Sequence, residues 1–121
     1  MSYKKLDIYN KGMELFFRVH PLSLKLPKYE MYELGSQIRR SADAIVSNIA
    51  EGYGRRRYKA DYIRFLIYSH SSNDETLSHI TKLQQLYPDL QDELLVLERE
   101  YDSLGAQINT FIKYVESNWR T

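Results

Sequence analysis

A segment near the middle of the chain interleaves arginines with tyrosines, and its side chains suit the recognition of nucleic acid. Guanidinium groups bind phosphates through paired hydrogen bonds, and tyrosine rings stack on exposed bases. The candidate residues, which include two arginines one element earlier, are Arg39, Arg40, Arg55, Arg56, Arg57, Lys59, Arg64, Tyr53 and Tyr58. The same residues also fit a solubilising turn whose arginines pair with Glu51, Asp61 or an acidic neighbouring helix.

Charge is unevenly distributed along the chain, although the formal net charge is only +1. The charged residues within 55–64 are all basic except Asp61, and the charged residues within 89–102 are all acidic except Arg99. The near-neutral total argues against a polycation. The local excess predicts a basic end or stripe that faces an acidic partner.

The histidines do not suggest a metal site. A di-metal site in a helical bundle needs Glu-x-x-His pairs, and no histidine here follows an acidic residue by three positions. Glu75 and His79 are four residues apart, which is typical of an exposed polar pair on a helix. The chain has no cysteine, no Gly-x-Ser-x-Gly and no phosphate-binding loop, so we predict no catalytic residue, metal or cofactor.

One pair of residues has a spacing known from nucleases. Arg64 and His70, separated by five residues, resemble the Arg-x4-6-His motif of HEPN ribonucleases, which are also helical bundles. On one continuous helix the two side chains would point about 120° apart, which is poor geometry for a shared site. Because the spacing fits but the geometry is poor, a ribonuclease that uses Arg64 and His70 is kept only as an alternative to a non-enzymatic protein.

Length and composition predict one helical domain, residues 1–121. Five glycines and three prolines are too few for an all-β or loop-rich fold. No apolar run approaches the ~20 residues that cross a bilayer, and the first residues lack the apolar core of a signal peptide. We therefore expect a cytoplasmic protein with no membrane partner and no small-molecule substrate.

Four amphipathic segments with short connections predict an all-α, antiparallel up-down-up-down four-helix bundle. The expected helices run from Lys5 to the mid-twenties, from Met31 to Ala50, from Lys59 to Tyr87, and from about Leu90 onward. The last two carry buried-type residues in alternating steps of four and three, and each should be about 40 Å long.

Local signals suggest how these helices begin and end. Pro21 predicts a kink or an early end of the first helix. Gly52 and Gly54 suit the left-handed backbone that terminates a helix, here the second. Asp89 is a good N-cap for the fourth helix.

Several polar side chains lie on or beside faces that a bundle would bury. They are Gln37, Ser41, Asn48, Glu51, Ser69, Asn73, Glu75 and Thr76. Buried polar groups need partners, so these residues form either a satisfied network within one chain or a contact between subunits. Eleven tyrosines add amphipathic contact area, and on balance we favour a homo-oligomer.

The segment from Asn48 to Gly52 reads Asn-Ile-Ala-Glu-Gly. With the preceding Gln37-Ile38-Arg39-Arg40, it resembles the signature of the four-helix-bundle proteins encoded in 23S ribosomal RNA intervening sequences. The resemblance covers nearly the whole chain and implies a ring-like homopentamer. A related group comprises the accessory variability proteins of diversity-generating retroelements, which are strongly basic and associate with a reverse transcriptase and nucleic acid.

Three departures from that resemblance stand out. The near-neutral net charge differs from that of the retroelement group. Ser69 and Ser71 replace small Ala and Gly residues, which predicts a looser or more hydrogen-bonded contact of the third helix. Arg57 and Tyr58 stand where a Ser N-cap is common, which predicts a weaker start for that helix.

Taken together, the sequence predicts a non-catalytic, oligomeric helical-bundle interaction module. Its expected partners are further copies of itself and, through the basic segment, RNA or an enzyme that processes nucleic acid. A purely structural self-assembling protein is the other alternative.

Overall fold

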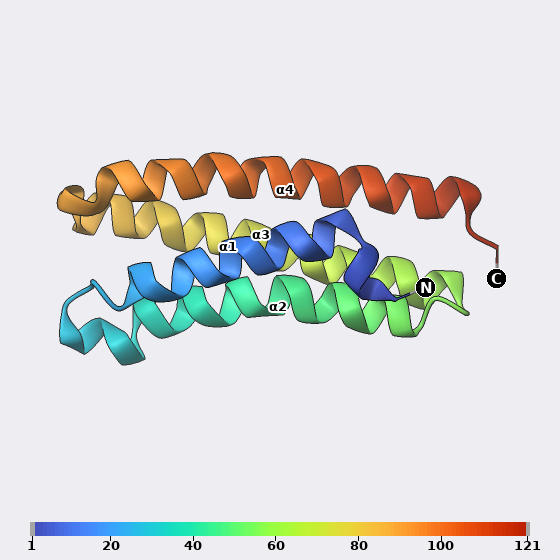
Figure 1. Ribbon diagram of the computed structural model, residues 1–121, viewed down its shortest axis with the longest axis horizontal. Helices are drawn as coiled ribbons and strands as arrows, with labels where there is room; N and C mark the ends of the chain where they lie inside the picture. Colours follow the sequence, from blue (N-terminus) through green and yellow to red (C-terminus); the bar gives the residue numbers. More distant parts are fainter. Residues whose placement is uncertain (1, 121) are drawn as a thin grey trace.

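The computed structural model describes residues 2–120, and within this range the chain forms four α-helices (Figure 1). They are α1 (Asp7–Ser23), α2 (Leu34–Gly54), α3 (Lys59–Leu86) and α4 (Gln91–Asn118). Short 3-10 helices precede α1 (η1, Tyr3–Lys5), α2 (η2, Lys28–Tyr32) and α4 (η3, Pro88–Leu90). Successive helices run in opposite directions, so the predicted all-α, up-down-up-down bundle is confirmed.

The heptad patterns of the last two helices are confirmed. Each helix has 28 residues, and the pattern residues from Tyr62 to Leu83 in α3 are buried. In α4 the pattern residues from Leu94 to Val115 are also buried, except that Phe111 is partly exposed. These residues join the buried faces of α1 and α2 in one core cluster.

The prediction that Gly52 and Gly54 end α2 in a left-handed conformation is wrong. No described glycine has a positive φ, and α2 runs past Gly52 and includes Gly54 as its last residue. A Cβ atom on Gly52 would lie 3.1 Å from the Phe65 Cβ and 3.3 Å from the Tyr62 carbonyl oxygen. Gly52 therefore lets α2 approach α3 closely.

The early end of α1 that Pro21 predicted is confirmed, because Pro21 lies in the last turn and the helix ends two residues later at Ser23. Another predicted helix signal differs from the structure. Asp89 belongs to η3 and does not cap α4, whose N-cap position is held by Leu90 with no side-chain hydrogen bond. Tyr58 at the N-cap of α3 also makes no capping hydrogen bond, and the weaker start of this helix stays a prediction.

The two ends of the bundle carry different connections. Figure 1 places the α2–α3 turn at the same end as the start of α1 and the end of α4. The α1–α2 and α3–α4 connections lie at the other end. Since α1 has only 17 residues, α4 extends beyond it at the end that carries the α2–α3 turn (Figure 1).

Candidate nucleic-acid interface

The basic turn between α2 and α3, residues 55–58, is anchored to the end of α4. The Trp119 indole Nε1 donates a hydrogen bond of 2.7 Å to the Arg56 carbonyl. The Lys59 ammonium donates one of 2.6 Å to the Glu116 carbonyl. Because the turn and the first residue of α3 are each hydrogen-bonded to the end of α4, the turn has a fixed position at this end of the bundle.

Charge in the folded chain is separated along the bundle axis. The midplane follows from contacts: the Gly12 Cβ position faces Val46 and Leu104, and Ser69 bonds to the Ile45 carbonyl. We call residues 2–12, 47–68 and 105–120 the basic half, since they contain ten Lys and Arg against four Asp and Glu. The acidic half, residues 13–46 and 69–104, contains seven against twelve. The small net charge thus conceals a strongly polarised molecule.

Two arginines of the turn are partly engaged within the chain. The Arg55 guanidinium pairs with Glu51 at 2.8 Å and lies 4.8 Å from the centre of the Phe65 ring. The Arg56 guanidinium stacks 3.9 Å over the Tyr53 ring and donates to the Tyr53 carbonyl. The expected pairing of arginines with Glu51 is therefore present, and Arg55 remains exposed enough to meet a further anion.

The other predicted members of the interface differ in how open they are. Arg64 pairs with Asp61 at 3.0 Å. Within residues 2–120, Arg57 forms no ion pair and lies 5.8 Å from the ring of Tyr58, which is 56% exposed. Tyr53 is only 5% exposed and packs in the core, so Tyr58 rather than Tyr53 offers a ring face at the turn.

The structure does not bring Arg39 and Arg40 to the turn. Both lie in the acidic half, about 22 to 24 Å along α2 from Arg55. Arg39 donates hydrogen bonds to the Ser23 hydroxyl and the Met31 carbonyl, which ties the α1–α2 connection to α2. Arg40 is exposed on the same part of the helix.

The polar residues that α3 buries against α2 and α4 form hydrogen bonds within the chain, although the Oδ1 atom of Asn73 is buried with no partner among residues 2–120. The Ser69 hydroxyl donates to the Ile45 carbonyl at 2.7 Å, and the hydroxyls of Ser41 and Thr76 share a hydrogen bond of 2.8 Å. Asn73 donates its side-chain amide to the Tyr101 carbonyl of α4. The more hydrogen-bonded contact expected of Ser69 is confirmed.

The remaining residues of the predicted polar set lie outside that network. Gln37, Glu51 and Glu75 are exposed, and the half-buried Asn48 donates to the Ala44 carbonyl of its own helix. A contact between subunits through this set would have to use these four residues.

The described residues form neither a shared site of Arg64 and His70, which the ribonuclease alternative requires, nor a cluster that could hold a metal ion. Arg64 and His70 lie on different sides of α3: Arg64 is exposed and pairs with Asp61, whereas the half-buried His70 lies near Gly105 of α4. Within residues 2–120 no three His, Asp or Glu side chains are placed to hold a metal ion. The Nε2 atom of His79 is 3.5 Å from Glu75, too far for a good hydrogen bond.

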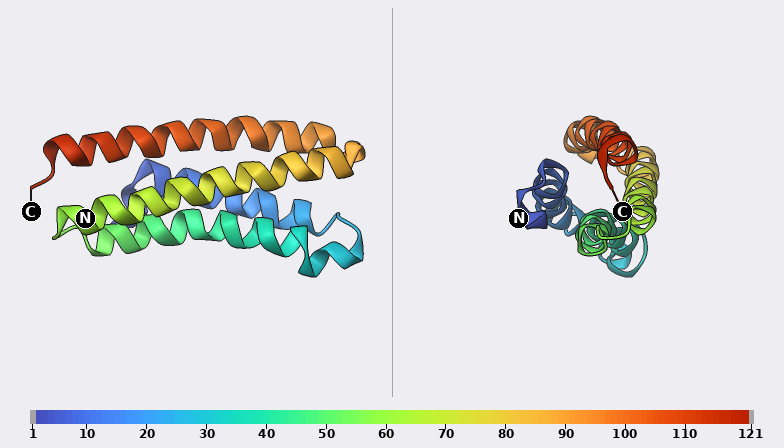
Figure 2. Two further views of the ribbon diagram at one scale, coloured as in Figure 1. Left: turned by 180° about the vertical axis from the view of Figure 1, so that it is seen from behind. Right: turned by 90° about the vertical axis from the view of Figure 1, so that its right-hand side faces the viewer.

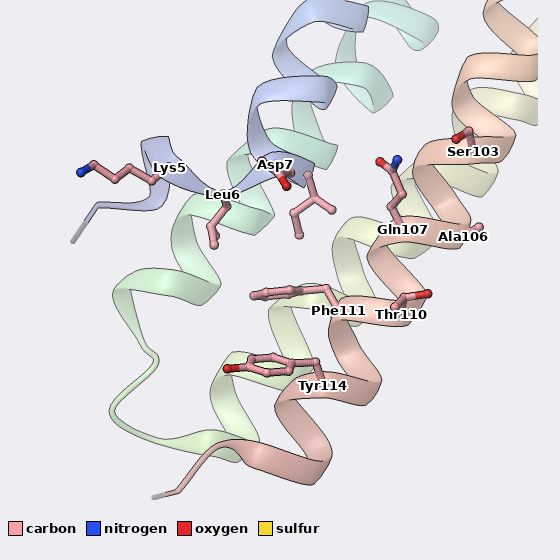
Figure 3. Close-up of a pocket in the computed structure, with 10 residues that line it drawn as sticks. Lys5, Leu6, Asp7, Ser103, Ala106, Gln107, Thr110, Phe111 and Tyr114 are labelled. Atoms are coloured by element: carbon pink, nitrogen blue, oxygen red, sulfur yellow. The ribbon is translucent and has the colours of Figure 1, made fainter.

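A groove between the start of α1 and the end of α4 was not predicted (Figure 3). It has a volume of about 570 Å³, and Phe111 and Tyr114 of α4 form its aromatic wall. Tyr62 lies behind Phe111, where burial raises the pKa of its phenol to about 12. Tyr114 directly precedes Val115, a buried residue of the heptad pattern, and is not itself part of that pattern. The periodicity therefore gave no sign that Tyr114 lines a groove.

A comparison with known protein families finds one family whose model matches most of the chain. Residues 4–110 match the model of a family described as 23S rRNA-intervening sequence protein. The chain belongs to this family. The match ends just before Phe111, so the aromatic wall of the groove lies outside the part of this intervening-sequence protein that defines the family.

A solved structure has the same fold as this intervening-sequence protein. It is a protein of unknown function from the S23 ribosomal protein family of Bacteroides thetaiotaomicron, with a TM-score of 0.78 and 20% sequence identity. The match covers 88% of this chain and 95% of the other. No curated protein matches, and the relation to the retroelement group stays a prediction.

The segment that carries the family resemblance has a structural role in this intervening-sequence protein. Ile49 is fully buried, Gly52 allows the close approach of α3, and Glu51 pairs with Arg55. The resemblance therefore supports the fold and assigns no chemistry. Among the helices of residues 2–120, none has an apolar stretch that would cross a bilayer.

Proposed function

We propose that this intervening-sequence protein is a non-catalytic, oligomeric interaction module that binds RNA through its basic half. The observation that carries the proposal is the charge separation, with ten cationic against four anionic side chains in that half. An RNA backbone carries one negative charge per nucleotide, so its attraction to the basic half should exceed its repulsion by the more distant acidic half. The proposal includes a cytoplasmic location.

Three exposed cations of the basic half allow a direct test. Lys4, Arg57 and Lys113 form no ion pair among the described residues, so their replacement by Gln breaks no ion pair and loses only the 5.8 Å contact of Arg57 with the Tyr58 ring. The triple variant should bind a short RNA roughly tenfold or more weakly at low salt and show a shallower dependence of affinity on salt. Fluorescence anisotropy over a salt series measures both quantities.

The acidic half offers a matched control. Lys28, Arg40 and Lys82 are exposed and unpaired within residues 2–120, and changing them to Gln alters the net charge by the same amount. RNA affinity should then fall about twofold or less, because only the long-range charge changes. Equal losses in the two triple variants would contradict a localised interface. If the wild type does not bind RNA at low salt, the proposed RNA binding is refuted. The protein would then be a purely structural assembly or would bind a protein partner.

Self-association is the second part of the proposal, with a homopentamer as the expected state. Ile67 and Tyr68 support it, since they are neighbours on α3 and are 48% and 47% exposed. Light scattering at micromolar concentration should show a multimer that an Ile67→Lys substitution weakens. A wild-type mass of 14.4 kDa, that of one chain, would contradict this part.

The proposed lack of catalysis has its own test. Wild-type protein incubated with labelled RNA should release no more fragments than buffer alone. Cleavage by the wild type that is lost in His70→Ala would instead establish the ribonuclease alternative.

A further inference from the structure

The groove between α1 and α4 has the shape of a ligand site, and its two walls come from opposite ends of the chain. Its α1 side consists of residues 5–8, and its α4 side consists of exposed positions between Ser103 and Tyr114. Figure 3 shows the rings of Phe111 and Tyr114 extending from α4 toward the start of α1. With a volume of about 570 Å³, the groove is large enough for a nucleobase and its sugar.

The aromatic wall of this groove is rigidly supported. The Phe111 and Tyr114 rings are stacked, with centroids 5.9 Å apart and an angle of 27° between their planes. Behind them, the fully buried Tyr62 packs its ring edge-to-face against Phe111 and Trp119. Tyr114 is nevertheless 50% exposed, so it offers a fixed ring surface on which another planar group can stack.

Two polar groups on opposite walls have unused hydrogen-bonding capacity. The Asp7 carboxylate lies on the α1 side and the Gln107 amide on the α4 side (Figure 3). Neither side chain has a hydrogen-bond partner within residues 2–120. A carboxylate accepts from amino groups, and an amide both donates and accepts, so together they suit the edge of a base.

The charge around the groove favours an anionic ligand. All but one of its lining residues belong to the basic half, the exception being Ser103. Lys5 lines the groove, and the exposed Lys4 and Lys113 are sequence neighbours of the lining residues Lys5 and Tyr114. The basic turn is joined to the same end of α4, because Trp119 bonds to the Arg56 carbonyl. A strand whose base enters the groove could therefore place its flanking phosphates near these cations.

We propose that the groove binds an unpaired base of single-stranded RNA, stacked on the aromatic wall of Phe111 and Tyr114 and hydrogen-bonded by Gln107 and Asp7. The proposal rests on the proposed function and adds to it a preference for single strands. In a duplex the bases are stacked and paired, so only the phosphates are available to the basic half. The contact to Tyr114 requires a base that can leave the stack.

The test compares a single-stranded RNA of twelve nucleotides with a duplex of the same length. Tyr114→Leu keeps apolar bulk but removes the ring, and should weaken single-strand binding roughly 5- to 100-fold while duplex binding changes little. Tyr114→Phe should bind as the wild type does, because it keeps a ring face. Tyr32→Leu, at an exposed tyrosine of the acidic half, serves as the control and should change neither affinity.

A second variant guards against a loss of fold. Gln107 is an exposed residue in the interior of α4, so Gln107→Ala should leave the thermal melt unchanged and weaken single-strand binding several-fold. Thermal melting by circular dichroism is recorded for every variant.

The possible outcomes separate the two proposals. If the wild type binds RNA but Tyr114→Leu and Gln107→Ala bind single strands normally, the base site is refuted and the proposed function stands. Equal weakening of single-strand and duplex binding by Tyr114→Leu also refutes the base site. A wild type that binds neither RNA refutes the proposed function and the base site together.

Discussion

The contact between α2 and α3 differs in kind from the contact between α1 and α4. The contact between α2 and α3 is formed by uncharged groups: Ser69 and Thr76 make buried hydrogen bonds to α2, and Gly52 packs directly against α3. Ion pairs border the contact between α1 and α4: the partly exposed Lys11 of α1 pairs with Glu100, and Lys25, just beyond the end of α1, pairs with Glu93. The end view in Figure 2 shows α1 set apart from α4, whereas α2 and α3 lie side by side.

The difference follows from side-chain size and charge. Small hydroxyl groups that bond to a facing helix can be buried at little cost, and they let the backbones approach closely. Long charged side chains stay partly in water, and the helices that they connect are held further apart. The closed contact therefore supports the fold. The open contact leaves grooves, including the one for which we propose a ligand.

The largest expected effect comes from filling the closed contact. Gly52→Val should destabilise the protein by about 1–3 kcal/mol, because the added methyl groups collide with α3 at Tyr62 and Phe65. Gly54→Ala is the matched control two residues away, where a Cβ meets nothing within 4 Å. It should be neutral or stabilise by up to about 1 kcal/mol, since alanine favours a helix. Urea denaturation measures both. Equal effects would mean that the contact is looser than described.

A smaller effect is expected when a hydrogen bond of the closed contact is removed. Ser69→Ala deletes the fully buried hydroxyl that bonds to the Ile45 carbonyl and should destabilise by about 1 kcal/mol. Ser71→Ala, at an exposed serine on the same helix, should change the free energy of unfolding by less than about 0.5 kcal/mol. If the two serines behaved alike, the buried hydrogen bond would contribute nothing to the contrast between the two contacts.

The smallest effect is expected in the open contact. Hydrogen bonding to Lys11, and then its charge, lowers the pKa of the Glu100 carboxyl below its usual range. A carboxyl with a lowered pKa stabilises the fold above its unfolded pKa, and this contribution is lost as the pH falls. Lys11→Met should therefore weaken the decline in stability on acidification below about pH 5, with a smaller effect near neutrality than Ser69→Ala.

Salt provides the control for this last prediction. The stability difference between wild type and Lys11→Met should shrink in 1 M NaCl, because the pair is partly exposed and salt screens it. Thermal melts at two pH values and two salt concentrations are sufficient. A difference that persists at high salt would indicate that α1 and α4 are held together by packing rather than by charge.

The success of sequence reasoning varied with the range of the interaction. Buried positions in α3 and α4 were predicted because the heptad period expresses which side of a long helix faces its neighbours. The end of α2 was predicted wrongly, because a glycine that terminates a helix and one that admits a neighbouring helix have the same sequence signal. Asp89 failed as a cap because Pro88 begins a 3-10 turn that places Leu90 at the N-cap.

The candidate interface shows the same division. Interleaved arginines and tyrosines marked the turn, and the structure keeps Arg57 and Tyr58 open there. Arg39 and Arg40 lie far from the turn, in the acidic half, and Tyr53 is buried. Residue type alone could not reveal either fact. Phe111 and Tyr114 were missed, because their groove exists only where α4 extends beside the short α1.

The sequence by itself determined the class of fold, the lengths of the two long helices and the family, because these follow from periodicity and from a short run of residue types. The tertiary structure alone decided which polar residues pair inside the chain and how charge divides between the two ends. It also decided where a groove opens. These properties depend on segments that are distant in sequence and become neighbours only when antiparallel helices pack.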